Sequence, residues 1–165
     1  MSLMAADHVL TRTLVKPGAY ALAHWKNVAI IVWRGRPDGQ AVREVSVFSD
    51  RLLQEYAVFS VVHVVEETSG LPTSDGRHAL VAAARKNSGH VACVGVLLPE
   101  SRIVASMLRV SVRAMHKLVR GMLEVAVEPT LDALVVAMVD THVRRSGTRL
   151  TASELARAIQ EARSL

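Results

Sequence analysis

The chain has 165 residues, half of them hydrophobic, and a formal charge of +5 at pH 7. This length suits one domain that buries about two-thirds of the surface its unfolded chain exposes. The longest apolar runs are far shorter than the roughly 20 residues of a membrane-spanning helix. The single cysteine, Cys93, excludes an intramolecular disulfide, and its apolar neighbours favour a buried, unreactive thiol in a reducing cytoplasm.

The basic charge constrains the partners only loosely. An acidic partner would explain it, but sixteen arginines against four lysines also fit a codon bias of the genome. An aromatic content of 4% argues against single-stranded nucleic acid, because those grooves stack bases on aromatic rings. We therefore expect no nucleic-acid partner and no membrane span.

The chain begins without a secretory signal, and residues 1–17 show no firm hydrophobic period. We expect a lead-in there, with a cloning remnant at residues 1–3. A β-hairpin is predicted over residues 21–34, because two apolar segments flank Lys26-Asn27 and the second is rich in β-branched residues. After a break at glycine and proline, apolar residues recur at helical spacing over 42–56 and predict an amphipathic helix.

Two buried strands are predicted in the middle of the chain. Residues 58–65 and 91–98 are short, continuous apolar runs, the pattern of strands covered on both faces. Between them, residues 66–75 are interpreted as a loop. The alanine-rich stretch 78–86 is interpreted as a helix, which Gly89 can terminate.

Beyond Pro99 the sequence predicts a helix, a strand and two further helices. Thr130 can cap the second of these helices, and Thr151 has capping-box spacing to Glu154 at the start of the third. The predicted ranges are 101–120 for the long helix, 123–127 for the strand and 152 to about 163 for the last helix. The helix between the strand and the last helix contains residues 131–139 and is ended by residues 144–147.

These elements follow in the order ββαβαβαβαα. Strands that alternate with helices need crossover connections. The sequence therefore predicts an α/β fold with a mixed, mostly parallel sheet of about five strands, an N-terminal hairpin and crossover helices. We expect a lead-in over residues 1–17, one α/β domain over 18–143 and a C-terminal helical extension over 144–165.

This order resembles the anti-sigma-factor antagonist-like domains, the STAS and SpoIIAA-like superfamily. The similarity covers roughly residues 18–143 and includes the hairpin 21–34, the strand and loop 61–71 and the segment 128–134. It implies a non-enzymatic, bacterial-type regulatory or scaffolding domain that binds another protein.

Some members of that superfamily carry an Asp-Ser-Ser-Gly-Leu-Gly loop whose second serine is phosphorylated by a partner kinase. The resemblance therefore implies Ser69 as the phosphoacceptor. Three of the six loop positions differ here, and residues 73–76 argue against direct entry into a helix, so an unphosphorylated polar turn is the other interpretation. The matching stretch is Glu67-Thr68-Ser69-Gly70-Leu71-Pro72.

The sequence contains no recognisable catalytic, cofactor-binding or metal-binding motif. Its seven histidines form no His-Glu-x-x-His motif, and one cysteine gives no zinc pattern. A glycine-rich phosphate loop and a Gly-x-Ser-x-Gly motif are also missing. His63 is predicted to be a hydrogen-bonded core residue, and His116 to face solvent. We expect no enzyme activity, cofactor or metal.

Basic residues line the long helix on the side away from its apolar stripe. Such a line can receive an acidic protein or a phosphate-bearing ligand, although an ordinary solvated face has the same pattern. We interpret the chain as a protein-interaction domain; the alternatives are a binder of a small anionic or lipid-like ligand in a sheet–helix pocket, and a homodimer. The candidate interaction residues are Glu67, Thr68, Ser69, Arg109, Arg113, His116, Lys117 and Arg120.

Overall fold

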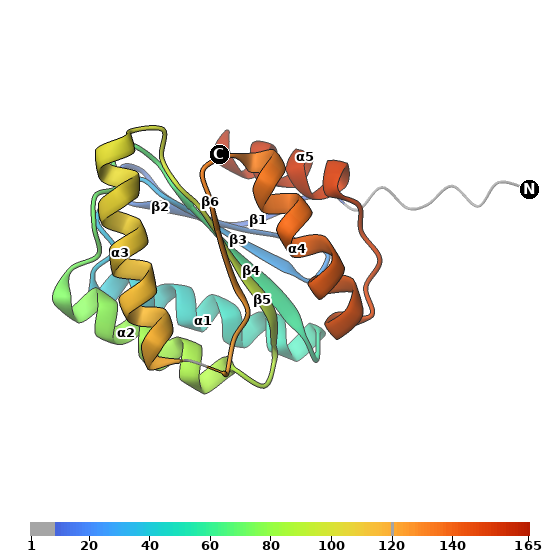
Figure 1. The fold of residues 1–165 in the computed structure, drawn as a ribbon. Helices are drawn as coiled ribbons and strands as arrows, with labels where there is room; N and C mark the ends of the chain where they lie inside the picture. The colour runs from blue at the N-terminus through green and yellow to red at the C-terminus, as the bar shows by residue number, and fades with distance from the viewer. Residues whose placement is uncertain (1–8, 120) are drawn as a thin grey trace, which may run out of the picture.

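The computed structural model describes residues 9–119 and 121–165 and has the predicted α/β architecture with a mixed sheet (Figure 1). Six strands lie in the order β1-β2-β3-β4-β5-β6. The strands are β1 (Thr11–Lys16), β2 (Tyr20–Trp25), β3 (Val28–Trp33), β4 (Phe59–Val65), β5 (Val91–Leu97) and β6 (Val125–Glu128). The helices are α1 (Gly39–Glu55), α2 (Ser74–Asn87), α3 (Arg102–Leu118), α4 (Leu131–Ser146) and α5 (Ala152–Arg163).

The predicted number of about five strands is wrong by one, because part of the expected lead-in forms β1. This strand pairs antiparallel with β2 at the edge of the sheet, and four of its six residues are exposed. An exposed edge strand is held by backbone hydrogen bonds and shows no apolar alternation, so its hydrophobic pattern did not reveal it. The predicted cloning remnant, residues 1–3, lies outside the described residues.

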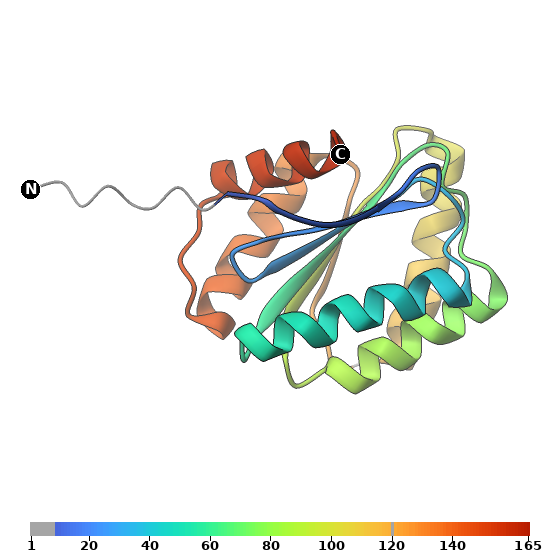
Figure 2. The same cartoon turned by 180° about the vertical axis from the view of Figure 1, so that it is seen from behind.

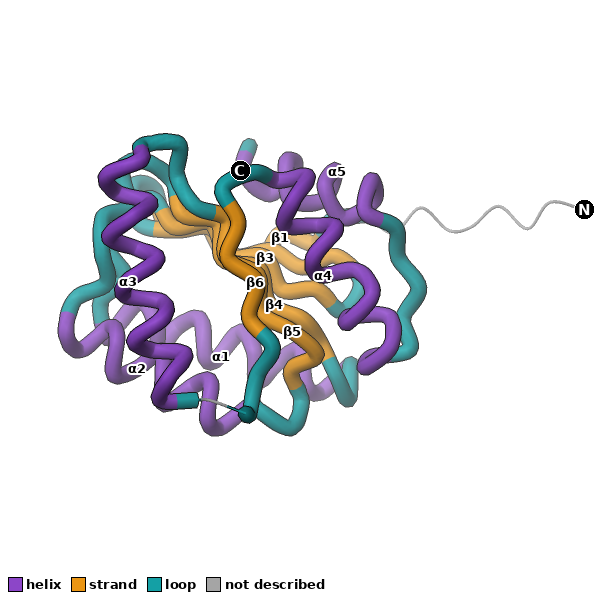
Figure 3. Tube along the Cα trace, viewed as in Figure 1, coloured by secondary structure: helices purple, strands orange, loops and turns teal. Residues whose placement is uncertain are grey.

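The sheet is the middle layer of three. β2 and β3 form the predicted antiparallel hairpin, and β3, β4, β5 and β6 run parallel to one another. Helices α1, α2 and α3 lie on one face of the sheet and α4 and α5 on the other (Figures 1 and 3). Because side chains alternate along a strand, Ile31 of β3 packs on the first face and Ile30 on the second.

Helix α2 begins at Ser74, four residues before the predicted start. Thr73 is its N-cap, and its Oγ1 accepts a hydrogen bond from the backbone N–H of Gly76 at 3.1 Å. A side-chain oxygen at this position satisfies one of the N–H groups that a helix start leaves unpaired. The prediction that residues 73–76 oppose direct helix entry is therefore wrong. None of the described helices is long and apolar enough to cross a membrane.

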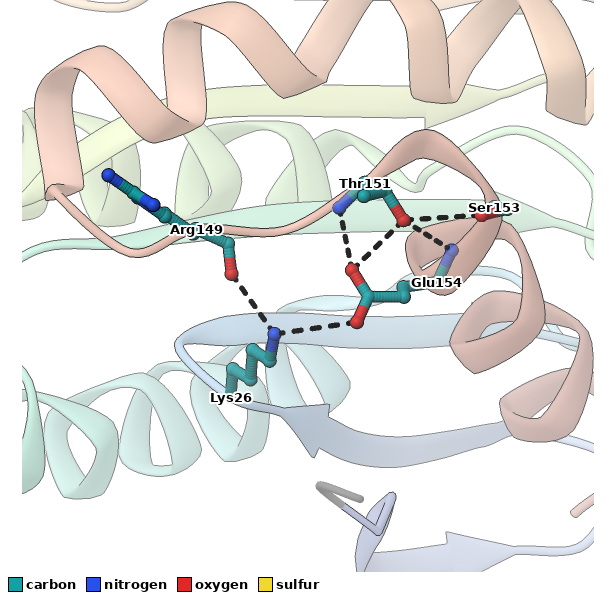
Figure 4. A network of polar contacts seen from close by, with 5 residues as sticks. All are labelled: Lys26, Arg149, Thr151, Ser153 and Glu154. Carbon is teal, nitrogen blue, oxygen red and sulfur yellow. Dashed lines mark hydrogen bonds and ion pairs between the residues drawn. The ribbon is translucent and has the colours of Figure 1, made fainter. Parts of the chain in front are cut away.

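The start of α5 is tied to the β2–β3 turn by Lys26, whose backbone has a positive φ of 49° (Figure 4). The Lys26 Nζ donates to the carbonyl of Arg149 at 3.0 Å and lies 3.8 Å from Oε1 of Glu154. Glu154 and Thr151 form the predicted capping box. Hydrogen bonds from Thr151, first from its backbone N–H, lower the pKa of Glu154. The polar network thus fixes where the last helix leaves the sheet.

Replacing Thr151 with Ala is expected to lower the free energy of unfolding by about 1 kcal/mol, because the first turn of α5 loses its cap. Ser153→Ala is the matched control, since the Ser153 hydroxyl contacts Thr151 without capping a backbone group. Urea denaturation followed by circular dichroism measures both. Equal losses in the two variants would argue that the cap does not stabilise α5.

Candidate functional site

A cavity lies between the sheet and the helices α1, α2 and α3. Its volume is about 180 Å³, and its walls are mainly apolar. The space persists because α3 packs loosely: only two of its 17 residues are buried, whereas α1, of the same length, buries six. An apolar cavity of about 150 Å³ can hold benzene. The cavity is therefore large enough for a small apolar molecule.

His63 provides a polar group in the sheet wall of this cavity. It lies on the same side of β4 as Val61 and Val65, which also line the space. The indole Nε1 of Trp33 donates to His63 Nδ1 at 3.0 Å, and the two rings are nearly parallel. This contact confirms the predicted hydrogen-bonded histidine.

The protonation of His63 follows from its surroundings. Burial lowers its pKa to about 4, so the ring is neutral at pH 7. A neutral imidazole carries one proton, and Nδ1 accepts a hydrogen bond from Trp33, so the proton resides on Nε2. Nε2 has no hydrogen-bond partner among the described residues. His63 therefore offers one free N–H donor within an apolar cavity.

Three serine hydroxyls of the cavity wall are already engaged in hydrogen bonds. Ser46 and Ser49 donate to carbonyls of their own helix, at 3.0 and 3.2 Å. The hydroxyl of Ser69 donates to the carbonyl of Gly35 at 3.1 Å. Among the described lining residues there is no Lys or Arg. The site thus provides no opposite charge for an anion.

The three loop residues of the sequence analysis lie in different surroundings. Ser69 is fully buried against the cavity wall, whereas Thr68 is exposed. The carboxylate of Glu67 accepts a hydrogen bond from the backbone N–H of Ser101, which precedes α3, at 2.7 Å. Transfer of a phosphate to Ser69 would require this loop to open, because its hydroxyl is covered in the present conformation.

The predicted basic line lies on α3, with Arg113 and Lys117 exposed and Arg109 partly covered. His116 does not face solvent as predicted. It is partly buried, lines the cavity, and its Nε2 lies 3.4 Å from the carbonyl oxygen of Leu123. At 100° per residue this position lies next to Val112 on the inner side of the helix. Arg120 lies outside the described residues.

A second polar cluster is buried on the opposite face of the sheet, between β4 and α4. Ser60 Oγ lies 2.7 Å from Nδ1 of His142, and His142 Nε2 lies 3.1 Å from Oγ of Ser146. Burial, and then the charge of Lys26, lowers the pKa of His142 to about 4. Ser60 and His142 are sealed from solvent, so this serine–histidine pair joins α4 to the sheet and offers no access to a substrate.

Cys93 adjoins this second cluster, with its Sγ 3.3 Å from Ser60 Oγ. The thiol is buried as predicted, and burial raises its pKa. A protonated, covered thiol is a poor nucleophile. The described residues hold no group of three or more His, Cys, Asp or Glu side chains placed to bind a metal ion.

The fold and these sites define an α/β domain with a mixed six-stranded sheet and one apolar cavity as its candidate site. No protein-family model, curated protein or solved structure matches the chain. The resemblance to the STAS and SpoIIAA-like superfamily stays a prediction.

The free N–H of His63 is the feature of the candidate site that could not be predicted from the sequence. The available signal was the position of His63 in a strand of β-branched residues, on the same side as Phe59 and Val61. An imidazole ring at that position indicates a hydrogen-bond partner on the same face of the sheet. The sequence did not show that Trp33 would satisfy one ring nitrogen and leave the other facing a cavity.

Proposed function

We propose that this domain binds a small, neutral, mainly apolar molecule in the cavity beneath α3. The observation that carries the proposal is the neutral His63, whose Nε2–H has no partner among the described residues of an apolar wall. The His63 side chain is partly exposed and lines the cavity, so its donor can be reached from that space. A ligand that brings one acceptor oxygen can pair with this N–H while its apolar part fills the cavity.

The chemistry of the walls selects the class of ligand. A carboxylate or phosphate would enter without a cationic partner, and burying an unpaired charge is strongly unfavourable. A carbonyl, ether or hydroxyl oxygen meets the need of His63 without that cost. The proposal therefore favours a lipid-like or aromatic molecule over an anionic nucleotide.

The protein-interaction function that the superfamily resemblance implies has less support from the loop 66–70. Ser69 is buried, and Glu67 is engaged with the start of α3. Glu66 forms a two-point ion pair with Arg163 of α5, at 2.8 and 3.0 Å. These side chains hold the domain together and are not free for a partner.

Acetophenone and isopropylbenzene test the proposal, because they are similar in size and only the first has a carbonyl oxygen. We expect acetophenone to bind at least tenfold more tightly, measured by NMR titration of the cavity methyl groups. His63→Leu should remove this preference. If neither compound shifts the cavity signals at millimolar concentration, or if His63→Leu keeps the preference, the proposal is wrong.

A cavity-filling variant locates the binding site. Val112 of α3 lines the cavity, and Val112→Phe is expected to weaken acetophenone binding more than tenfold by occupying the space. Val136→Phe is the matched control, because Val136 is 69% exposed on a helix of the other sheet face. Unchanged binding to Val112→Phe, with the fold intact, would place the ligand elsewhere.

A further inference from the structure

Helix α3 has an exposed apolar stripe in addition to its buried face. Ile103 and Val110 are 75% and 66% exposed, large values for apolar side chains. The stripe residues recur at intervals of three and four, so they share one side of the helix. They are Ile103, Met107, Val110, Ala114 and Leu118, and all are exposed.

A cationic line runs beside this stripe. At 100° per residue, Arg109, Arg113 and Lys117 lie next to the apolar stripe on the outward side of the helix. None of these three makes an ion pair or hydrogen bond with the described residues. Residues 101–123 include no Asp or Glu at all. The outer surface of α3 therefore carries apolar and cationic side chains and no acidic ones.

The position of α3 leaves this surface free. In Figures 1 and 2 the helix lies at the periphery, on the side of the molecule near β6 and away from α4 and α5. Only Ala105 and Leu108 of α3 are buried. The helix thus forms a ridge with a long apolar stripe pointing outward, a shape suited to a flat, deformable surface.

We propose that α3 docks the domain onto an anionic lipid surface. The apolar stripe enters the boundary between headgroups and acyl chains, and the cationic line contacts the lipid phosphates. This geometry is that of interfacial amphipathic helices, which lie in the plane of the surface and do not span it.

Two other occupants fit the surface less well. A second copy would bring its own cationic line against the first, and like charges oppose association. A partner helix would need an apolar seam that continues at heptad spacing over several turns. Ile103, Met107, Val110 and Ala114 follow this spacing, but the next heptad position is the charged Lys117. A lipid surface needs no such register.

Vesicle sedimentation of the full chain tests the proposal. We expect binding to vesicles of phosphatidylcholine and phosphatidylglycerol (3:1), and at least tenfold weaker binding to phosphatidylcholine alone. Two variants should each lose at least tenfold: Ile103→Ser with Val110→Ser, which removes the stripe, and Arg109→Glu with Arg113→Glu and Lys117→Glu, which reverses the line. Thermal unfolding verifies that both variants are folded.

A charge-matched control separates position from net charge. Arg12, Arg43 and Arg51 are exposed on β1 and α1, and their triple replacement by Glu changes the net charge equally. This control should keep vesicle binding. The proposal fails if wild-type protein does not bind anionic vesicles, or if the control loses as much binding as the α3 variants.

The Val112→Phe variant distinguishes lipid docking by α3 from ligand binding in the cavity. Val112→Phe should lose acetophenone binding but retain vesicle binding, because Val112 lies on the inner side of α3. Sedimentation equilibrium identifies a second copy. A wild-type dimer that the double serine variant dissociates would show that another chain covers the stripe, and would overturn the lipid proposal.

Discussion

Gly76→Ala is expected to lower the free energy of unfolding by about 2 kcal/mol or more, although alanine is ordinarily the better helix residue by about 1 kcal/mol. A Cβ at Gly76 would lie 2.1 Å from the carbonyl oxygen of Pro37. That oxygen also accepts a hydrogen bond from the backbone N–H of Thr73 at 3.0 Å. Since the clash is with backbone, no side-chain rotation relieves it, and α2 must move away from the segment before α1.

Urea denaturation measures this effect, with Gly89→Ala as the control. Gly89 follows the other end of α2, and a methyl group added there would meet no atom within 4 Å beyond its chain neighbours. Its replacement should therefore change stability by less than about 0.5 kcal/mol. A Gly76→Ala protein as stable as the wild type would mean that the Pro37 contact is not maintained in solution.

The stability of the domain is expected to fall as the pH decreases from about 6.5 to 4. His63 and His142 have pKa values of about 4 in the folded protein, against about 6.5 in an unfolded chain. Between these values the unfolded state binds protons that the folded state excludes, so protons favour unfolding. Each histidine then lowers the free energy of unfolding by about 3 kcal/mol between pH 6.5 and pH 4. Well above pH 6.5 both rings are neutral in the folded and the unfolded state, and they add no pH dependence.

Denaturation at pH 7.5, 6.0 and 4.5 tests this dependence in the wild type, in His63→Gln and in His142→Gln. Each variant should have a shallower decrease than the wild type, and the double variant the shallowest. A hydrogen bond from the Thr73 hydroxyl is the main cause that lowers the pKa of Asp75, and one from the Thr151 backbone N–H is the main cause for Glu154. These two carboxylates therefore change the stability mainly at pH values below the range in which the histidines take up protons. Identical slopes in all proteins would contradict the assignment.

The buried part of the fold could be predicted because burial leaves a pattern in the sequence. The hairpin, the strands β4 and β5 and the helix α1 each show apolar residues at the period of their structure. The edge strand β1 shows none, since most of its side chains face solvent. The early start of α2 depends on a hydrogen bond from Gly76 to Thr73, which outweighs the poor helix propensity of glycine at that position.

The candidate site was less predictable than the fold. The sequence indicated a histidine in a buried strand, but the role of His63 depends on Trp33, which lies on the neighbouring strand, and on the space beneath α3. Ser69 matched a surface motif, whereas the folded loop turns its hydroxyl toward the carbonyl of Gly35. Both features arise from residues distant in the chain, so local pattern alone could not place them.

The cavity has a consequence for how this chain tolerates substitution. The cavity of about 180 Å³ is packing that the domain lacks, because its lining side chains have no neighbouring atoms on that side. The helices α4 and α5 pack the opposite face of the sheet and supply a second core. Random substitutions selected only for heat resistance should therefore accumulate as larger side chains around the cavity. Selection for the native activity should keep the same positions small.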